Sequence, residues 1–201
     1  MNKRNLAVLG LAALLAGCGF QLRGTGSANF ALDELSVEAR DAYGPTVDLV
    51  EKTLERNGVR VHPGAPYDLH LVRENNLQRT ASYTSAARSA EHLLIFELDY
   101  QVRGPGGTLL IEEQVEVQKV SLYDQNNLIG ATQEAEQIRQ ELRREAVTQL
   151  MMRLRSLTPA ELDALQATAE ARAQAEAEAR EAERRREAAT PASSPLPVPF
   201  Q

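Results

Sequence analysis

The only cysteine of this 201-residue chain, Cys18, carries the one thiol available for covalent chemistry. It comes after two cations, Lys3 and Arg4, and a short apolar run at residues 6–16. A positive segment followed by a short apolar segment and small residues is typical of a secretory signal peptide. The apolar run is too short to cross a hydrocarbon core of ~30 Å as a stable helix. We therefore predict that residues 1–17 are a signal peptide.

Ala16 and Gly17, directly before Cys18, make this stretch resemble a bacterial lipobox. The resemblance implies a diacylglycerol on the Cys18 sulfur, cleavage before this residue and a further acyl chain on its nitrogen. Such an anchor is stable, because each buried CH₂ contributes about 0.8 kcal/mol and two chains already suffice. A free thiol in a secreted chain would have no disulfide partner, which favours lipidation over an incidental cysteine. Gly19 follows where an inner-membrane retention signal would have aspartate, which indicates sorting to the outer membrane.

The other residue types that could do acid–base, metal or nucleophilic chemistry form no recognisable site. The three histidines lack metal-ligand spacing. Glu112 and Glu113 point to opposite faces of a strand, the wrong geometry for shared acid–base work. The glycines within residues 104–107 join two strands and lack the lysine of a phosphate loop. We predict that the protein is not an enzyme and carries no cofactor besides the covalent lipid on Cys18.

The charge of the chain argues against nucleic acid as a partner. Its formal net charge is −6, and removal of Lys3 and Arg4 with the signal peptide lowers it to −8. Affinity for a phosphate backbone comes from clustered lysine and arginine. We therefore expect no nucleic-acid binding.

Strict alternation of apolar and polar residues predicts four strands. The clearest has Leu94, Phe96 and Leu98 on one face and Glu97 on the other. Such alternation indicates a sheet that is covered on one face only. Glu113 falls on the apolar parity, so we expect a bulge or an edge position near it. The expected strands are residues 35–39, 67–72, 94–103 and 109–118.

Two helices are available to cover the apolar face. The first begins at Pro45 and ends at Asn57-Gly58, which are the expected start and stop residues. The second covers about 133–156, with Thr132 as its cap and an apolar stripe along one side. The order of the elements predicts an α/β (α+β) fold. We expect a two-layer sandwich in which a four-stranded, mostly antiparallel sheet has two helices packed on one face.

Composition divides the chain into segments. Thr158 and Glu161 form a capping box that opens a further helix, and beyond Leu165 this helix is polar all round and has no core to join. The proline-rich end of the chain is predicted to be disordered. The expected segments are a lipoprotein signal peptide at 1–17, a lipidated N-terminus and linker at 18–30, an α/β sandwich domain at 31–158, a charged Ala/Glu/Arg-rich helix at 159–189 and a disordered Pro-rich tail at 190–201.

Three stretches occur in an order that is familiar from one protein family. They are Cys18-Gly19-Phe20-Gln21-Leu22-Arg23, Gly44-Pro45 with a helix that ends in Asn57-Gly58-Val59, and Thr80-Ala81-Ser82 followed by Ala90-Glu91 and an apolar strand. In this order they resemble the lipopolysaccharide-assembly lipoprotein family LptE. The resemblance covers Cys18 to about Leu157, and the tail beyond Pro159 is not part of it.

The resemblance implies a function without enzymatic chemistry. Members of this family plug the lumen of the outer-membrane β-barrel LptD in a 1:1 complex, help it fold and help to place lipopolysaccharide in the outer leaflet. It also implies a lipid-anchored location at the outer membrane, on the periplasmic side and within the barrel lumen. A barrel lumen is polar, and the predicted sheet offers one polar face.

The resemblance also bears on lipopolysaccharide as a direct ligand. Two basic positions that family members use for lipopolysaccharide fall at Ser85 and Gln133 in this chain. Arg79 and Arg88 are near them in the sequence, and guanidinium groups suit bidentate contacts with phosphate. We take Arg79 and Arg88 as the candidate lipopolysaccharide-binding residues, with solvated loop arginines as the alternative.

Two other classes of function stay open on the sequence. One is a lipid-anchored periplasmic solute-binding protein or enzyme, which would need a concave pocket with convergent polar groups. The other is an envelope scaffold, unrelated to lipopolysaccharide, that works through its C-terminal helix.

Overall fold

The computed structural model describes residues 30–40, 44–83, 89–124 and 127–189. The predicted signal peptide, Cys18, Arg88 and the predicted tail at 190–201 lie outside the described residues. Within them the elements are β1 (Glu34–Ala39), α2 (Pro45–Arg56), β2 (Arg60–Val61), β3 (Asp68–Tyr83), β4 (Ser89–Arg103), a 3-10 turn η1 (Pro105–Gly107), β5 (Leu109–Asp124), α3 (Leu128–Arg155) and α4 (Pro159–Ala189).

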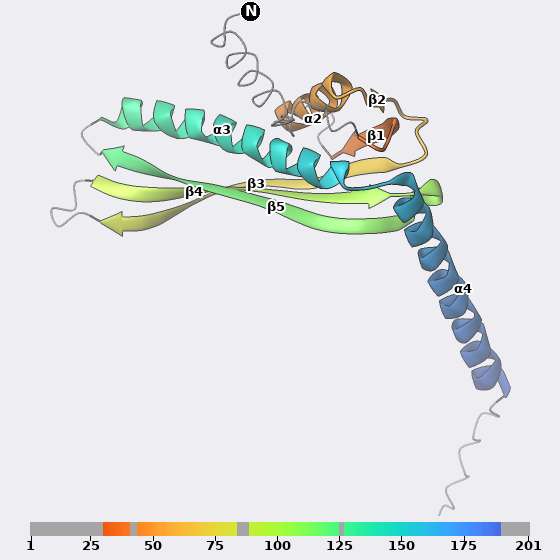
Figure 1. Cartoon of the computed structure of the whole chain (residues 1–201). Coiled ribbons are helices and arrows are strands. Elements are labelled where there is room, and N and C mark those ends of the chain that lie inside the picture. Colours follow the sequence, from red (N-terminus) through yellow and green to blue (C-terminus); the bar gives the residue numbers. More distant parts are fainter. Residues whose placement is uncertain (1–29, 41–43, 84–88, 125–126, 190–201) are drawn as a thin grey trace, which may run out of the picture.

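The strands form one sheet in the order β2-β1-β3-β4-β5. β1 is parallel to β2 and β3, whereas β3, β4 and β5 are antiparallel to one another. Helices α2 and α3 lie on the same side of this sheet (Figure 1), so the mixed α+β fold is confirmed. The predicted number of four strands is wrong, because Arg60 and Val61 pair with Glu34 and Leu35 as a fifth strand. Two residues are too few to show a period of alternation.

The three long strands extend well beyond the predicted ends. Residues 73–83 of β3 are mostly polar, with Leu77 as the one large aliphatic residue, so alternation does not reveal them, yet all of them except Ala81 pair with β4. β1 covers only residues 68–71 of β3 on the other side, which leaves the rest of β3 at an open edge of the sheet. Backbone hydrogen bonds to β4 therefore hold this part of the strand, with little help from burial.

Helix α3 begins five residues before the predicted start at Gln133. Its cap is Asn127, whose Oδ1 accepts a 3.1 Å hydrogen bond from the Gly130 N–H, and not Thr132 as predicted. A glycine in a helix interior normally destabilises the helix. The sequence therefore did not indicate this first turn. A Cβ at position 130 would overlap the Asn127 side chain, so any other residue there would displace the cap.

A third helix, α4, follows a short connection and extends away from the sheet (Figure 1). The predicted capping box is confirmed: the Thr158 N–H donates to Glu161 Oε2 at 2.9 Å, and the Glu161 N–H donates to Thr158 Oγ1 at 3.3 Å. Leu162 is fully buried in the core, so packing continues beyond the 31–158 segment expected for the sandwich. From Leu165 onward the residues are exposed or half-buried.

The core lies between the sheet and the two covering helices. In β4 the predicted face is confirmed, with Leu94, Phe96, Leu98, Tyr100 and Val102 all buried. On α3 the matching stripe consists of Ile138, Leu142, Ala146, Val147, Leu150, Met151 and Leu154. Among the described residues, no helix is both long and apolar enough to span a bilayer.

Candidate functional site

The candidate cation Arg79 lies on the face of the sheet opposite to α2 and α3. Register places it beside Leu93 of β4, which in turn pairs with Val120 of β5. Arg79 is exposed to solvent. Its predicted companion Arg88 lies outside the described residues, and so does Ser85. Gln133 is exposed on α3, one of the two helices that cover the opposite face.

Two register shifts in β3 determine which side chains reach this open face. Leu71 points to the helices and is buried, and the shift between Leu71 and Arg73 turns Arg73 to the open face. There the Arg73 guanidinium contacts Asp99 of β4, with 2.7 Å between Nη2 and Oδ2. The Gln114 amide of β5 donates to the other Asp99 oxygen at 2.7 Å. This part of the open face is therefore polar, as the alternation predicted.

Further along the arm formed by β3, β4 and β5, the same face becomes apolar. Ile95 is 5% exposed although no helix covers it, and Leu77, Val120 and Leu122 are 37%, 50% and 63% exposed. Leu93 is half-buried between them. We call these five residues the apolar band: Leu77, Leu93, Ile95, Val120 and Leu122. The band was not predicted, because β5 was expected to end at residue 118. Its signal in the sequence is that Leu77, Leu93, Val120 and Leu122 lie on the parity of their strands that is otherwise mostly polar.

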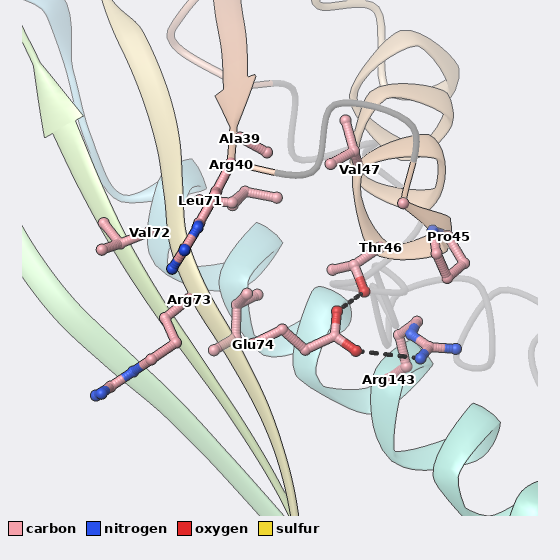
Figure 2. Close-up of a pocket in the computed structure, with 12 residues that line it drawn as sticks. Ala39, Arg40, Pro45, Thr46, Val47, Leu71, Val72, Arg73, Glu74 and Arg143 are labelled. Carbon is pink, nitrogen blue, oxygen red and sulfur yellow. Dashed lines mark hydrogen bonds and ion pairs between the residues drawn. The ribbon is translucent and has the colours of Figure 1, made fainter.

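A hollow lies on the helix side of the sheet, where β1 ends. Figure 2 shows its lining, which comes from the ends of β1 and α2, from the register shift in β3 and from Arg143 of α3. The hollow has a volume of about 510 Å³. Residues 41–43, which join two of its walls, lie outside the described residues.

Three polar side chains of this hollow, Thr46, Glu74 and Arg143, bind one another. The Glu74 carboxylate accepts a hydrogen bond from the Thr46 hydroxyl and lies 3.1 Å from Nη2 of Arg143 (Figure 2). The Arg143 guanidinium also lies 5.9 Å from the centre of the Phe96 ring. A solute site needs polar groups that converge on the ligand. Here the charged side chains instead tie α2 and α3 to β3.

Glu113 faces the helices from the edge strand β5, which confirms the predicted edge position. The Tyr100 hydroxyl donates to Glu113 Oε2 at 2.8 Å, and Arg153 Nη1 of α3 lies 3.0 Å from the same oxygen. Burial, together with the hydrogen bond to Glu113, raises the pKa of Tyr100 to about 12. The Tyr100 phenol is therefore neutral at physiological pH. Tyr100, Glu113 and Arg153 together stabilise the structure and supply no acid–base chemistry.

A second phenol fixes the base of α4. The Tyr67 hydroxyl donates to Asp163 Oδ1 at 2.5 Å, and burial together with this bond raises the pKa of Tyr67 to about 12. The Gln166 amide donates to Thr108 Oγ1 at 3.2 Å, beside the turn between β4 and β5. A Cβ at Gly104 would overlap the end of the Gln166 side chain, so a larger residue there would displace this contact between the helix and the turn.

Two of the histidines lie beside acidic side chains of β1. His62 lies 3.3 Å from Glu34, and His70 lies 3.5 Å from Glu38. In the part of the chain that the structure describes, no group of three His, Cys, Asp or Glu side chains could hold a metal ion.

Comparison with known sequences gives a family. The model of the lipopolysaccharide-assembly family LptE matches residues 32–154, which cover the sheet and both covering helices. Proteins named LPS-assembly lipoprotein LptE from Yersinia pestis (strain Pestoides F) and Yersinia pseudotuberculosis serotype O:1b are each 32% identical to the chain over 168 residues. The matched region is 81% of this chain and 81% of each relative.

Solved structures agree on the fold. The crystal structure of rare lipoprotein B from Shewanella oneidensis has a TM-score of 0.56 and 24% identity, over 61% of this chain and 94% of that one. A minor lipoprotein from Acinetobacter baumannii has a TM-score of 0.55 and 15% identity, over 63% of this chain and 93% of that one. At these identities the likeness concerns the fold alone.

Proposed function

This chain belongs to the lipopolysaccharide-assembly family LptE, and on that premise we propose that it plugs the outer-membrane barrel LptD, assists its assembly and takes part in the insertion of lipopolysaccharide into the outer leaflet. The family is a non-enzymatic accessory family and depends on no cofactor. One observation carries the proposal: the match runs through the whole sandwich, residues 32–154.

The cell envelope is the location that a lipoprotein of this family requires. We propose the outer membrane as the specific site, with attachment through a diacylglycerol and an N-acyl chain on Cys18. Three acyl chains exceed the two that give stable anchoring. The anchor would hold the folded domain at the periplasmic side, where it can enter the barrel during assembly.

The polar open face supports the plug. Its side chains already satisfy one another across the strands, as in the contacts of Arg73 and Gln114 with Asp99 and of Asn75 with Glu97. A surface of this kind can face a polar, water-filled lumen without loss of hydrogen bonds. The alternative of a solute-binding protein is disfavoured by the hollow in Figure 2, where Glu74 is bound by Thr46 and Arg143.

Depletion of the protein in its own host tests the proposal. We expect the amount of folded LptD in the outer membrane to fall and newly made lipopolysaccharide to stop reaching the cell surface. A plasmid copy should restore both, whereas Cys18→Ala should restore them poorly because the precursor cannot receive its lipid. Normal surface lipopolysaccharide and normal LptD after full depletion would overturn the proposal.

A further inference from the structure

The two edges of the sheet differ in how they are protected. At β5, Arg153 of α3 donates to the backbone carbonyl of Gln114 at 2.8 Å. Lys119 of β5 lies 2.7 Å from Glu141 of the same helix. Charged side chains and a covering helix are common means by which proteins keep an edge strand from pairing further. We call this the guarded β5 edge.

The edge of β3 lacks such protection beyond the end of β1. β1 pairs with β3 only at residues 68–71, and β3 continues past it along the arm (Figure 1). Within the described residues, no strand pairs with residues 73–83 on this side. The stretch has no lysine and no proline, and residues 76–82 are all exposed. A row of unpaired N–H and C=O groups is a template for a further strand.

We propose that the open β3 edge, residues 73–83, receives an extended segment of the LptD barrel as an added strand. The inference rests on the proposed function and gives the plug a specific contact surface. The added strand would continue the row that β1 leaves at Ala39, beside Leu71. The hollow in Figure 2 is lined by both of these residues and leaves room for the end of the segment at this junction.

The length of the open β3 edge fits a segment of a barrel. At about 3.3 Å per residue, residues 73–83 extend over roughly 35 Å. A transmembrane β-strand has about 9–11 residues, so a segment that follows the height of the lumen can pair with the whole edge. In strand addition the affinity comes from main-chain hydrogen bonds. Single side-chain changes on the edge are therefore tolerated.

The open β3 edge alone is too small for a stable dimer of this chain. With a sheet about 10 Å thick, its contact area is roughly 350 Å², well below the ~800 Å² per partner of a stable interface. A barrel segment does not depend on this edge alone, because the proposed plug also meets the polar lumen through its open face. The edge therefore fits a partner that already encloses the domain.

Site-specific photo-crosslinking in the protein's own host tests the added strand. A photoreactive residue replaces Asn76, Gln78 or Thr80, one at a time, because these residues are exposed and share one face of β3. The full, lipidated chain is irradiated in cells, and the captured residues are identified by mass spectrometry. We expect all three positions to capture one short LptD segment. The captured residue should move by about two for each step of two along β3, because paired strands keep a register.

The matched control positions are Gln114, Glu116 and Gln118 on the guarded β5 edge, which are also exposed and alternate along one strand. Contacts of these positions with the barrel should not show the stepwise shift. Captures from the open β3 edge that scatter over several LptD segments would overturn the proposal. Capture of residues 19–29 of the same chain, capture of a second copy, or no capture at all would overturn it too.

A pair of cysteines then tests the register. Cys18 is the only native cysteine of the chain and is lipidated in the proposed function, so Gln78→Cys supplies a single free thiol. A cysteine at the LptD residue captured from position 78 should form a disulfide with it, because bonded cysteines need Cα atoms about 4.4–6.8 Å apart. A cysteine one residue further along LptD points to the opposite face of the strand and should not.

Equal disulfide formation at both LptD positions would contradict strand pairing. It would leave the proposed function intact, because the chain and LptD would still be in contact. Failure of the proposed function has a different signature, which is normal surface lipopolysaccharide and normal LptD after depletion.

Discussion

The hydroxyl of Tyr100 and the carboxylate of Glu113, which lie opposite each other on β4 and β5, form a 2.8 Å hydrogen bond on the helix-covered side of the sheet. Arg153 of α3 contacts the same carboxylate at 3.0 Å. One acidic residue on an otherwise apolar parity thus joins the edge strand, its neighbour and the long helix. The carboxylate is compatible with this position because a cation and a phenol bind it there.

Glu113→Ala should lower the free energy of unfolding by about 1–2 kcal/mol, chiefly because the buried Tyr100 hydroxyl loses its acceptor. The ion pair with Arg153 is partly exposed and adds little. Urea denaturation measures the change. Glu112→Ala is the control, because Glu112 binds Gln101 on the exposed side, and it should stay within about 0.5 kcal/mol. Equal losses in the two variants would contradict the orientation of β5.

Stability should fall in alkali through the two buried phenols. Burial, with a carboxylate partner in each case, raises the pKa of Tyr67 and of Tyr100 from 10 to about 12. A pKa that is higher in the folded state contributes stability that is complete below about pH 10 and is lost as the pH rises toward 12. Tyr100→Phe should therefore make the unfolding free energy less dependent on pH in this range. An unchanged slope would mean that Tyr100 titrates normally.

The sequence predicted the parts of the fold in which burial alternates. Phe96 and Leu98 follow the helix-facing parity that their pattern indicated, and the start and stop residues of α2 are where the sequence placed them. The far half of β3 could not be predicted in this way, because it is mostly polar and is held chiefly by its pairing with β4. Arg60–Val61 was missed for a different reason, since two residues are too few to show alternation.

Leu162 and Leu165 should differ sharply when replaced by alanine. Leu162 is fully buried, whereas Leu165 is 38% exposed. Leu162→Ala should cost about 2–5 kcal/mol of unfolding free energy, and Leu165→Ala less than about 1 kcal/mol. Denaturant titration of the full chain compares them. Similar costs would mean that the base of α4 does not dock as described. Truncation after Glu170 should leave stability unchanged, because the residues beyond it are exposed.

The candidate site was only partly open to sequence reasoning. Arg79 could be named because a guanidinium suits phosphate, but its neighbours Leu93 and Val120 come from two other strands. Arg79, Leu93 and Val120 become neighbours only through the register of three strands and the shift at Leu71. No local sequence pattern reveals that register. The apolar band therefore became visible only once the strands were paired.

Charge reversal of Arg79 should weaken lipid binding without affecting the fold. Arg79→Glu should lower the affinity for intact lipopolysaccharide, and more strongly at low ionic strength, because exposed charges are screened over about 8 Å at physiological salt. Adding Arg88→Glu should increase the loss if both cations contact phosphate. Arg172→Glu on exposed α4 is the control and should have no effect. Affinity that does not change at low salt would show that Arg79 is merely solvated.

The most direct test of the account is the composition of the complex that the protein forms in the outer membrane. Tagged full-length chain should be purified in mild detergent from its own host, and the molar ratio of its partners determined by quantitative mass spectrometry. We expect LptD in a 1:1 ratio, and the Arg79→Glu variant should retain it. Recovery of the chain without a stoichiometric LptD barrel would contradict it.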